Sequence, residues 1–152
     1  MSTWGGFAYY NPVNLMTFKT EEDRKREQRA IETFVSVFGG SYKKLDPLDI
    51  DYKVFDKDGN LISYVEVKGR IRTIASAYPL CVSVEKLVKL MKKRLNPVII
   101  WACEDGIIYA KVDDLVGTIK MGGRKKREGA YNDIELMAYY EKQKPMKYVR
   151  YS

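Results

Sequence analysis

The sequence contains no histidine, and this absence narrows the chemistry open to the protein. It excludes Ser-His-Asp triads, Cys-His pairs, histidine general bases and histidine-rich metal sites. The chain has only two cysteines, which cannot hold a zinc cluster by themselves. Any chemistry must therefore use carboxylates, lysine, arginine, tyrosine or backbone groups.

The sequence also lacks long apolar runs. None approaches the roughly 20 residues that a membrane span requires, and the N-terminus has no charged-then-apolar secretory signal. We therefore expect an intracellular, cytoplasmic protein with no membrane partner. The 152 residues, of which 45% are hydrophobic and 31% charged, predict one soluble domain over residues 1–152. Within it we expect an aromatic-rich N-terminal arm at residues 1–19 and a basic C-terminal extension at residues 117–152.

Positive charge is in excess. There are 27 Lys and Arg against 20 Asp and Glu, which gives a net charge of +7. This balance favours a polyanionic partner, with nucleic acid first and an acidic membrane surface second. The candidate phosphate contacts are Arg70 and Arg72, and the Gly-flanked run Arg124, Lys125, Lys126 and Arg127. Both sets also fit a solvated surface.

Residues 49–70 predict a β-hairpin, because two runs of alternating pattern meet at an Asp-Gly pair, residues 58–59. If that pair is the whole loop, Asp51 lies directly opposite Glu66. Side chains at i and i+2 share a face of a strand. The reverse face is then apolar and is expected to be buried; it receives Ile50, Tyr52, Val54, Leu61, Val65 and Val67.

The polar face of this hairpin predicts a metal site. The same register sets Asp49 against Lys68, on the side that carries Asp51 and Glu66. Like charges directly across a ladder destabilise it by up to about 1 kcal/mol, so the Asp51–Glu66 pair calls for a compensating cation. Lys68 could supply part of that charge, and Mg²⁺ could supply more, since it favours carboxylate oxygens, water and phosphate. The arrangement suits metal-assisted phosphodiester hydrolysis, with Lys68 orienting the water or stabilising developing charge. The alternative is an ordinary solvated strand face.

A helix is predicted over residues 20–38, with Thr20 as its N-cap and a Gly pair at its end. Its apolar stripe includes Ile31 and Phe34, and one turn earlier the stripe reaches Glu27. A carboxylate at the edge of the core is costly unless it is paired. Glu27 is therefore expected either to form a salt bridge with Arg or Lys or to have a functional role.

The remaining pattern predicts an α/β fold. We expect a short strand at residues 41–45, a second amphipathic helix at 83–95 and a strand buried on both faces at 98–103. A strand, a helix and a buried strand imply a right-handed crossover and a mixed sheet. The sequence further predicts a strand at 107–112, a short helix at 132–141 and an edge strand at 146–151.

Residues Glu21 to about Val112 resemble the PD-(D/E)XK nuclease superfamily. The resemblance rests on the order of a helix with an inward Glu, an Asp-bearing strand, a Glu-x-Lys strand, a helix and a strand. The hairpin from Asp51 through YKVFDKDGNLISYVEVKG is similar to that of restriction-endonuclease-like and Holliday-junction-resolvase-like members. The resemblance implies a restriction-endonuclease-like mixed central sheet flanked by helices.

Carried onto this sequence, the resemblance implies a role for each motif residue. Asp51 and Glu66 would be metal ligands, the backbone carbonyl of Val67 a further ligand, and Lys68 the catalytic lysine. Glu27 would be an auxiliary acidic residue near the metal. Asp49 is the alternative match for the motif aspartate; we prefer Asp51 because the register places it opposite Glu66.

The expected function is a nuclease that hydrolyses DNA with Mg²⁺, for which Mn²⁺ can substitute. A phage or mobile-element role in DNA recombination, repair or processing would suit it. Cutting both strands commonly needs two sites, so a homodimer is compatible with this function. The alternative is a nucleic-acid-binding relative of the same fold that does not cleave.

Overall fold

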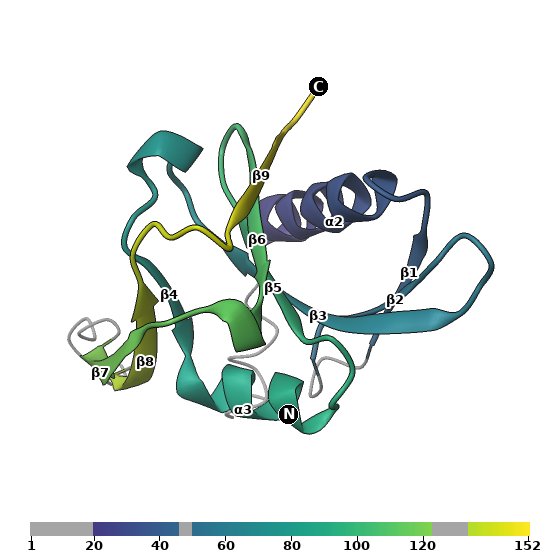
Figure 1. The fold of residues 1–152 in the computed structure, drawn as a ribbon. Coiled ribbons are helices and arrows are strands. Elements are labelled where there is room, and N and C mark those ends of the chain that lie inside the picture. The colour runs from purple at the N-terminus through teal and green to yellow at the C-terminus, as the bar shows by residue number, and fades with distance from the viewer. Residues whose placement is uncertain (1–19, 46–49, 123–133) are drawn as a thin grey trace, which may run out of the picture.

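The computed structural model describes residues 20–45, 50–122 and 134–152, and these residues form two sheets with helices packed on them (Figure 1). The larger sheet has the strand order β1-β2-β3-β5-β6-β9, and the smaller has the order β4-β8-β7. The elements are α2 (Glu21–Ser36), β1 (Ser41–Lys44), β2 (Tyr52–Phe55), β3 (Leu61–Gly69), β4 (Leu80–Ser83), α3 (Val84–Lys92), β5 (Val98–Ala102), β6 (Gly106–Lys111), β7 (Thr118–Gly122), β8 (Glu135–Tyr140) and β9 (Lys147–Arg150), with short 3-10 turns at Ile74–Ser76 and Val112–Asp114.

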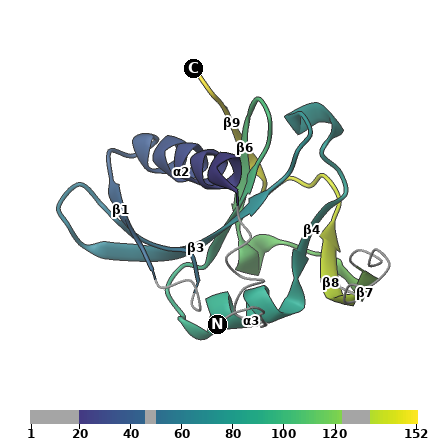
Figure 2. The same ribbon diagram turned by 180° about the vertical axis from the view of Figure 1, so that it is seen from behind.

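The helix α2 begins where the sequence predicts. Thr20 and Asp23 form a reciprocal capping box, in which the hydroxyl of Thr20 accepts from the Asp23 N–H at 3.1 Å. The apolar stripe of α2 packs on the larger sheet and buries Ala30, Ile31, Phe34 and Val35. Glu27 is buried with them, as expected from its place one turn before Ile31. Figure 2 shows α2 along this face of the sheet.

The hairpin of β2 and β3 has the expected register and a different turn. Tyr52 pairs with Val65 and Val54 with Ser63, as predicted. The loop has three residues rather than two, because the Asp56 N–H bonds to the carbonyl of Asn60. Gly59 adopts a φ of 84°, which glycine tolerates best. A bulge between Val54 and Phe55 absorbs the extra residue and restores the register before the strands reach the predicted site.

The apolar face of the hairpin is buried against α2 in most positions. Tyr52, Val54, Val65 and Val67 belong to the cluster beneath α2. Ile50 is also buried but lies in the cluster on the opposite side of the sheet, because the chain bends at Asp51. Leu61, near the turn, is only half-buried.

The centre of the larger sheet confirms the predicted mixed topology. The strands β3 and β5 are parallel, and α3 lies between them in the chain, whereas β6 and β9 run antiparallel to their neighbours. Every residue of β5 is buried, as the apolar run predicts. Gly106 begins β6 where a side chain would collide with the carbonyl oxygen of Val149, so β9 can approach closely only because this residue is glycine.

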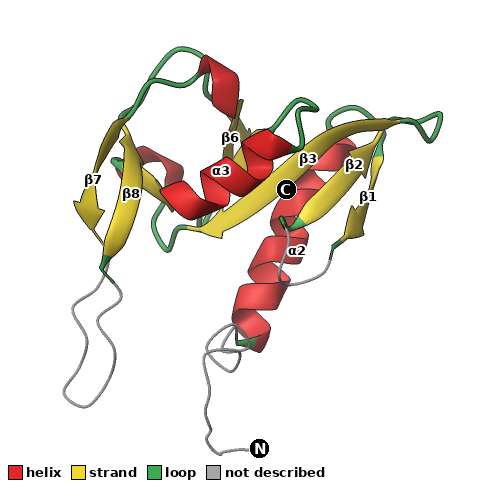
Figure 3. Ribbon diagram, turned by 90° about the horizontal axis from the view of Figure 1, so that it is seen from below, coloured by secondary structure: helices red, strands yellow, loops and turns green. Residues whose placement is uncertain are grey.

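A second core fills the other face of the larger sheet. It lies between β5, α3 and the smaller sheet, and its largest buried side chain is Trp101. The indole N–H of Trp101 donates to the carbonyl of Cys81 on β4 at 2.9 Å, which ties the two sheets together. Figure 3 shows β3 passing between the two helices, with α3 on one side and α2 on the other. Side chains at the end of β3 can therefore be reached from both helices.

The observed secondary structure differs from the predicted one in three respects. The helix expected at residues 132–141 is the strand β8 over its described part, because Glu135–Tyr140 pairs with β4 and β7. The strands β4 and β7 were not expected at all. The helix α3 is shorter than predicted, and its apolar residues Val88 and Met91 are 46% and 45% exposed. Within the described ranges, no helix has both the length and the apolar character to cross a bilayer.

Candidate active site

The candidate site lies where β3 continues past the end of β2. The last described pair of that ladder is Tyr52 with Val65, whereas β3 runs on to Gly69 beside β5. Just before β2 the chain bends at Asp51, whose carbonyl accepts from the Leu45 N–H at 2.9 Å. The carboxylate of Asp51 then turns to β3, where Oδ2 accepts from the N–H of Val67 at 2.8 Å. The Asp51 side chain thus supplies the hydrogen-bond acceptor that a neighbouring strand would otherwise supply to β3.

Glu66 is a buried carboxylate with a raised pKa. Its side chain is buried on β3, and burial together with the neighbouring Asp51 carboxylate raises its pKa to about 7. Its Oε2 lies 3.4 Å from the Nζ of Lys86 on α3. Its Oε1 is buried without a hydrogen-bond partner. A buried, unpartnered carboxylate oxygen is costly unless something else binds it.

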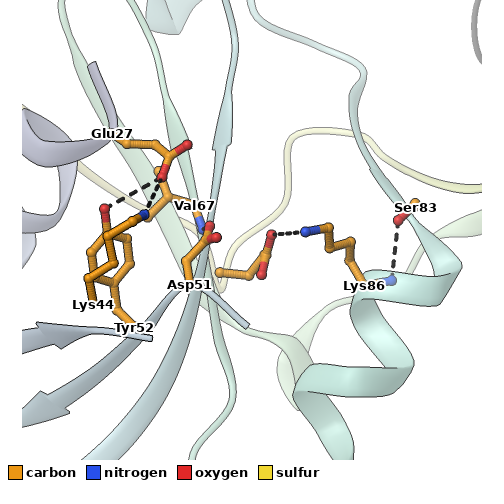
Figure 4. Close-up of polar contacts among 8 residues, drawn as sticks. Glu27, Lys44, Asp51, Tyr52, Val67, Ser83 and Lys86 are labelled. Carbon is orange, nitrogen blue, oxygen red and sulfur yellow. Dashed lines mark hydrogen bonds and ion pairs between the residues drawn. The ribbon is translucent and has the colours of Figure 1, made fainter. Parts of the chain in front are cut away.

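Glu27 approaches the site from α2 (Figure 4). Its Oε1 accepts a long hydrogen bond from the Tyr52 hydroxyl at 3.4 Å and lies 3.6 Å from the Nζ of Lys44. The expected salt bridge is therefore present, with a lysine from β1 as the partner. Burial, followed by the Glu27 and Asp51 carboxylates, raises the pKa of Tyr52 well above its ordinary range, so Tyr52 is a hydrogen-bond donor here.

A pocket of about 240 Å³ opens beside Glu66 and Glu27. Lys68, which is exposed, lines it two residues beyond Glu66 on the same face of β3. Within the described part of the chain Lys68 forms no ion pair, so its ammonium is not committed to Glu66. The other lining residues are Asp23, Arg26, Glu27, Glu66, Val67, Gly69 and Lys86.

The donor groups suit a hard divalent cation. Asp51 and Glu66 bring two carboxylates together, and one buried Glu66 oxygen lacks a partner. No group of three or more His, Cys, Asp or Glu side chains able to hold a metal ion occurs in the described ranges. A group of three protein ligands is not required for Mg²⁺, which usually binds one or two carboxylates and completes its coordination shell with water and phosphate. The chemistry of these residues therefore fits a hard divalent cation better than zinc.

The basic residues predicted to contact phosphate have different surroundings. Arg70 follows β3, and its guanidinium holds the next loop by donating to the carbonyls of Ala77 at 2.7 Å and Pro79 at 3.4 Å. Arg72 is exposed. The other predicted residues of the site lie outside the described residues: Asp49, Arg124, Lys125, Lys126 and Arg127.

Sequence reasoning missed two lysines of the site. Lys44 pairs with Glu27, and Lys86 pairs with Glu66. A signal was available, because Lys86 lies four residues before Leu90, the only residue of α3 that is buried, and residues at that spacing share a helix face.

A hairpin that carries Asp51 on one strand and Glu66-x-Lys68 on the other, in a mixed sheet between helices, is consistent with the restriction-endonuclease-like fold. The sequence matches, over residues 14–145, the protein family described as "Phage putative PDDEXK endonuclease". Because the match covers most of its length, the chain belongs to this family. Membership makes it a nuclease with nucleic acid as its class of substrate. Comparison with curated proteins and with solved structures gave no match.

Proposed function

We propose that the protein is a Mg²⁺-dependent endonuclease that hydrolyses DNA phosphodiester bonds, with Mn²⁺ able to replace Mg²⁺. Asp51 and Glu66 would hold the ion through their carboxylates, and the backbone carbonyl of Val67 would be a further ligand. The observation that carries the proposal is the buried, unpartnered Oε1 of Glu66 beside the Asp51 carboxylate. Such a pair is unfavourable by itself, and a bound cation would compensate it.

Each residue of the site has a distinct role in this proposal. When bound, the ion lowers the pKa of a water molecule and neutralises charge on the phosphodiester. Lys68, exposed at the pocket and free of ion pairs among the described residues, orients the attacking water and stabilises the developing charge. The hydrogen bond from the Val67 N–H fixes the Asp51 carboxylate. Glu27 is the auxiliary acidic residue, held by Lys44 and Tyr52.

Substrate contact would use the excess positive charge of the chain. A net charge of +7 favours the DNA backbone, and phosphate contacts position a protein on DNA without reading its sequence. Arg72 is exposed near the end of β3 and is the better placed of the two arginines that follow Lys68, because Arg70 already holds the carbonyls of its loop. The run from Arg124 to Arg127 would supply further contacts.

The test is a cleavage assay on supercoiled, linear, single-stranded and branched DNA, with Mg²⁺, Mn²⁺ or EDTA. We expect metal-dependent cleavage by the wild type. Lys68→Ala and Glu66→Ala should lose it, with DNA binding retained when binding is measured in EDTA. Lys111→Ala, which removes an exposed lysine of β6, is the matched control and should cleave normally.

A non-catalytic DNA-binding protein of the same fold would give a different result. The wild type would then bind DNA but show no metal-dependent cleavage of any of the four substrates. Cleavage that survives both Lys68→Ala and Glu66→Ala would contradict the assigned site. The active site of the nuclease would then have to lie elsewhere on the chain.

A further inference from the structure

The ion pair between Lys86 and Glu66 crosses from α3 to the candidate active site. Lys86 comes from a different element than Asp51, Glu66 and Lys68, and no motif of the hairpin includes it. Its ammonium is the cation that the described residues supply to Glu66, whereas Lys68 forms no ion pair with them. The site is therefore compensated by a lysine that the Glu-x-Lys pattern does not contain.

The backbone of Lys86 is held firmly. The strand β4 leads into α3 without a loop, and β4 pairs along its length with β8. Ser83 caps the helix, and its hydroxyl accepts from the Lys86 N–H at 3.2 Å. Leu90, on the same side of the helix, is fully buried. Figure 4 shows Lys86 extending from the first turn of α3 toward the site.

The side chain of Lys86 is held less firmly. It is 43% exposed, whereas that of Glu66 is 7% exposed, and the ammonium reaches only one oxygen of the carboxylate at 3.4 Å. Ion pairs with a partly exposed lysine are weak, worth up to about 1 kcal/mol. The ammonium can therefore move into solvent at small cost, while Glu66 stays in place.

We propose that Lys86 is a positioning residue that neutralises Glu66 in the metal-free protein and that a divalent cation displaces it. This inference rests on the proposed function. Ammonium and cation both draw their stabilisation from the same carboxylate and repel each other, so metal binding weakens the Lys86–Glu66 ion pair and favours its release. Lys86 thereby weakens metal binding, whereas a metal ligand would strengthen it. A purely structural ion pair would affect stability and leave metal affinity unchanged.

The experiment is a titration of each metal-free protein with Mn²⁺ alone, followed by the electron paramagnetic resonance signal of free Mn²⁺. The titration is done without DNA and near pH 8.5, where carboxylates are ionised. Lys86→Met and Lys86→Gln should bind Mn²⁺ about fivefold more tightly than the wild type, which corresponds to removal of an ion pair worth about 1 kcal/mol. Lys86→Arg keeps the charge and should stay within about twofold of the wild type. Lys89→Met, which removes an exposed lysine of the same helix, should do the same.

Unchanged or weaker Mn²⁺ binding by both Lys86→Met and Lys86→Gln would overturn the inference. Two neutral variants are used because the amide of Gln can still donate to Glu66, and circular dichroism verifies that each is folded. Glu66→Gln separates this failure from that of the proposed function. If wild type binds Mn²⁺ and Glu66→Gln does not, the metal site stands whatever Lys86 does. If Glu66→Gln binds as tightly as wild type, both proposals fall.

Discussion

The Asp51 carboxylate accepts a hydrogen bond from the backbone N–H of Val67, with 2.8 Å between Oδ2 and N. Both residues are buried. Asp51 therefore stabilises the end of β3 in addition to the metal-binding role that we propose. Substitutions at this position can separate the two roles, because an amide oxygen accepts a hydrogen bond as a carboxylate does but carries no charge.

Asp51→Ala should lose both activity and stability, whereas Asp51→Asn should lose mainly activity. The alanine leaves the Val67 N–H buried and unpaired, which costs about 1–3 kcal/mol. The asparagine keeps an acceptor for that N–H. Urea denaturation measures the free energy of unfolding, and a metal-dependent cleavage assay measures activity. Equal destabilisation by the two variants would show that the hydrogen bond contributes little.

Asp49 provides the comparison for Asp51. We expect Asp51→Ala to remove more nuclease activity than Asp49→Ala, because the Asp51 carboxylate lies close enough to Glu66 to raise its pKa. Both variants remove one carboxylate from the same stretch of chain, so net charge is matched. A larger loss in Asp49→Ala would mean that Asp49 is the principal ligand and that our assignment of the motif aspartate is wrong.

Glu66→Gln should stabilise the metal-free protein at about pH 8 while abolishing cleavage. Burial and the Asp51 carboxylate raise the pKa of Glu66, so its ionised form is held in the fold at a cost. A neutral side chain of the same shape removes that cost, and we expect a gain of about 1–3 kcal/mol in the free energy of unfolding. Thermal denaturation in EDTA measures it. Glu32→Gln, which changes an exposed carboxylate of α2, is the control. A destabilised Glu66→Gln would indicate that the pair with Lys86 outweighs the repulsion.

Local patterns predicted the part of the fold that surrounds the site. The N-cap at Thr20, the buried run of β5 and the alternation of β2 and β3 each follow from short-range rules. The register was right although the turn was wrong, since a bulge restored it. The strand β8 was taken for a helix because its pairing with β4 lies more than 50 residues away along the chain, and tertiary pairing overrides local preference.

The candidate site was predictable from its own hairpin and from the periodicity of one helix. Asp51, Glu66 and Lys68 are close in sequence, and an inward Glu27 follows from helical periodicity. The spacing from Leu90 places Lys86 on the inner face of its helix, but its pairing with Glu66 depends on how α3 crosses β3, which no local pattern specifies. Arg70 was predicted as a candidate phosphate contact. Its guanidinium donates to two carbonyls of the loop that follows β3, and the sequence of that loop has no periodic pattern from which these hydrogen bonds could be predicted.

Stability should fall in acid through Asp105, which lies between β5 and β6. Its carboxylate accepts from the Ile74 N–H at 2.8 Å and pairs with Arg150, and the backbone hydrogen bond is the main reason that the pKa of Asp105 is lowered. A lowered folded-state pKa gives stability that is present above the unfolded value of about 3.9 and lost as pH falls through the folded value. Asp105→Ala should therefore melt below wild type at neutral pH, and the difference should narrow in acid.

The control for Asp105 is Asp113→Ala, which alters an exposed aspartate in the turn after β6. It should melt close to wild type at every pH. Melting temperatures are followed by circular dichroism between about pH 2 and 7, a range that extends well below the unfolded pKa of about 3.9. A difference between Asp105→Ala and wild type that stays constant into acid would show that packing, rather than the charge, accounts for the lower melting temperature.

Binding of DNA should depend on the basic run of residues 124–127. If these four side chains bind phosphates, replacing all of them with serine should weaken binding and make it less sensitive to salt. The slope of log affinity against log salt should shrink by about 0.9 for each phosphate that the variant no longer neutralises. Affinity is measured in EDTA, so that no cleavage occurs, at several salt concentrations.

The matched variant removes four exposed lysines from other parts of the chain, Lys57, Lys111, Lys142 and Lys144. Both variants lower the net charge by the same amount, so a difference between their slopes reports direct phosphate binding rather than overall charge. We expect the variant in residues 124–127 to show the greater decrease in slope. Equal slopes would mean that the run acts only through long-range attraction, and the phosphate contacts would then have to lie at Arg72 and elsewhere.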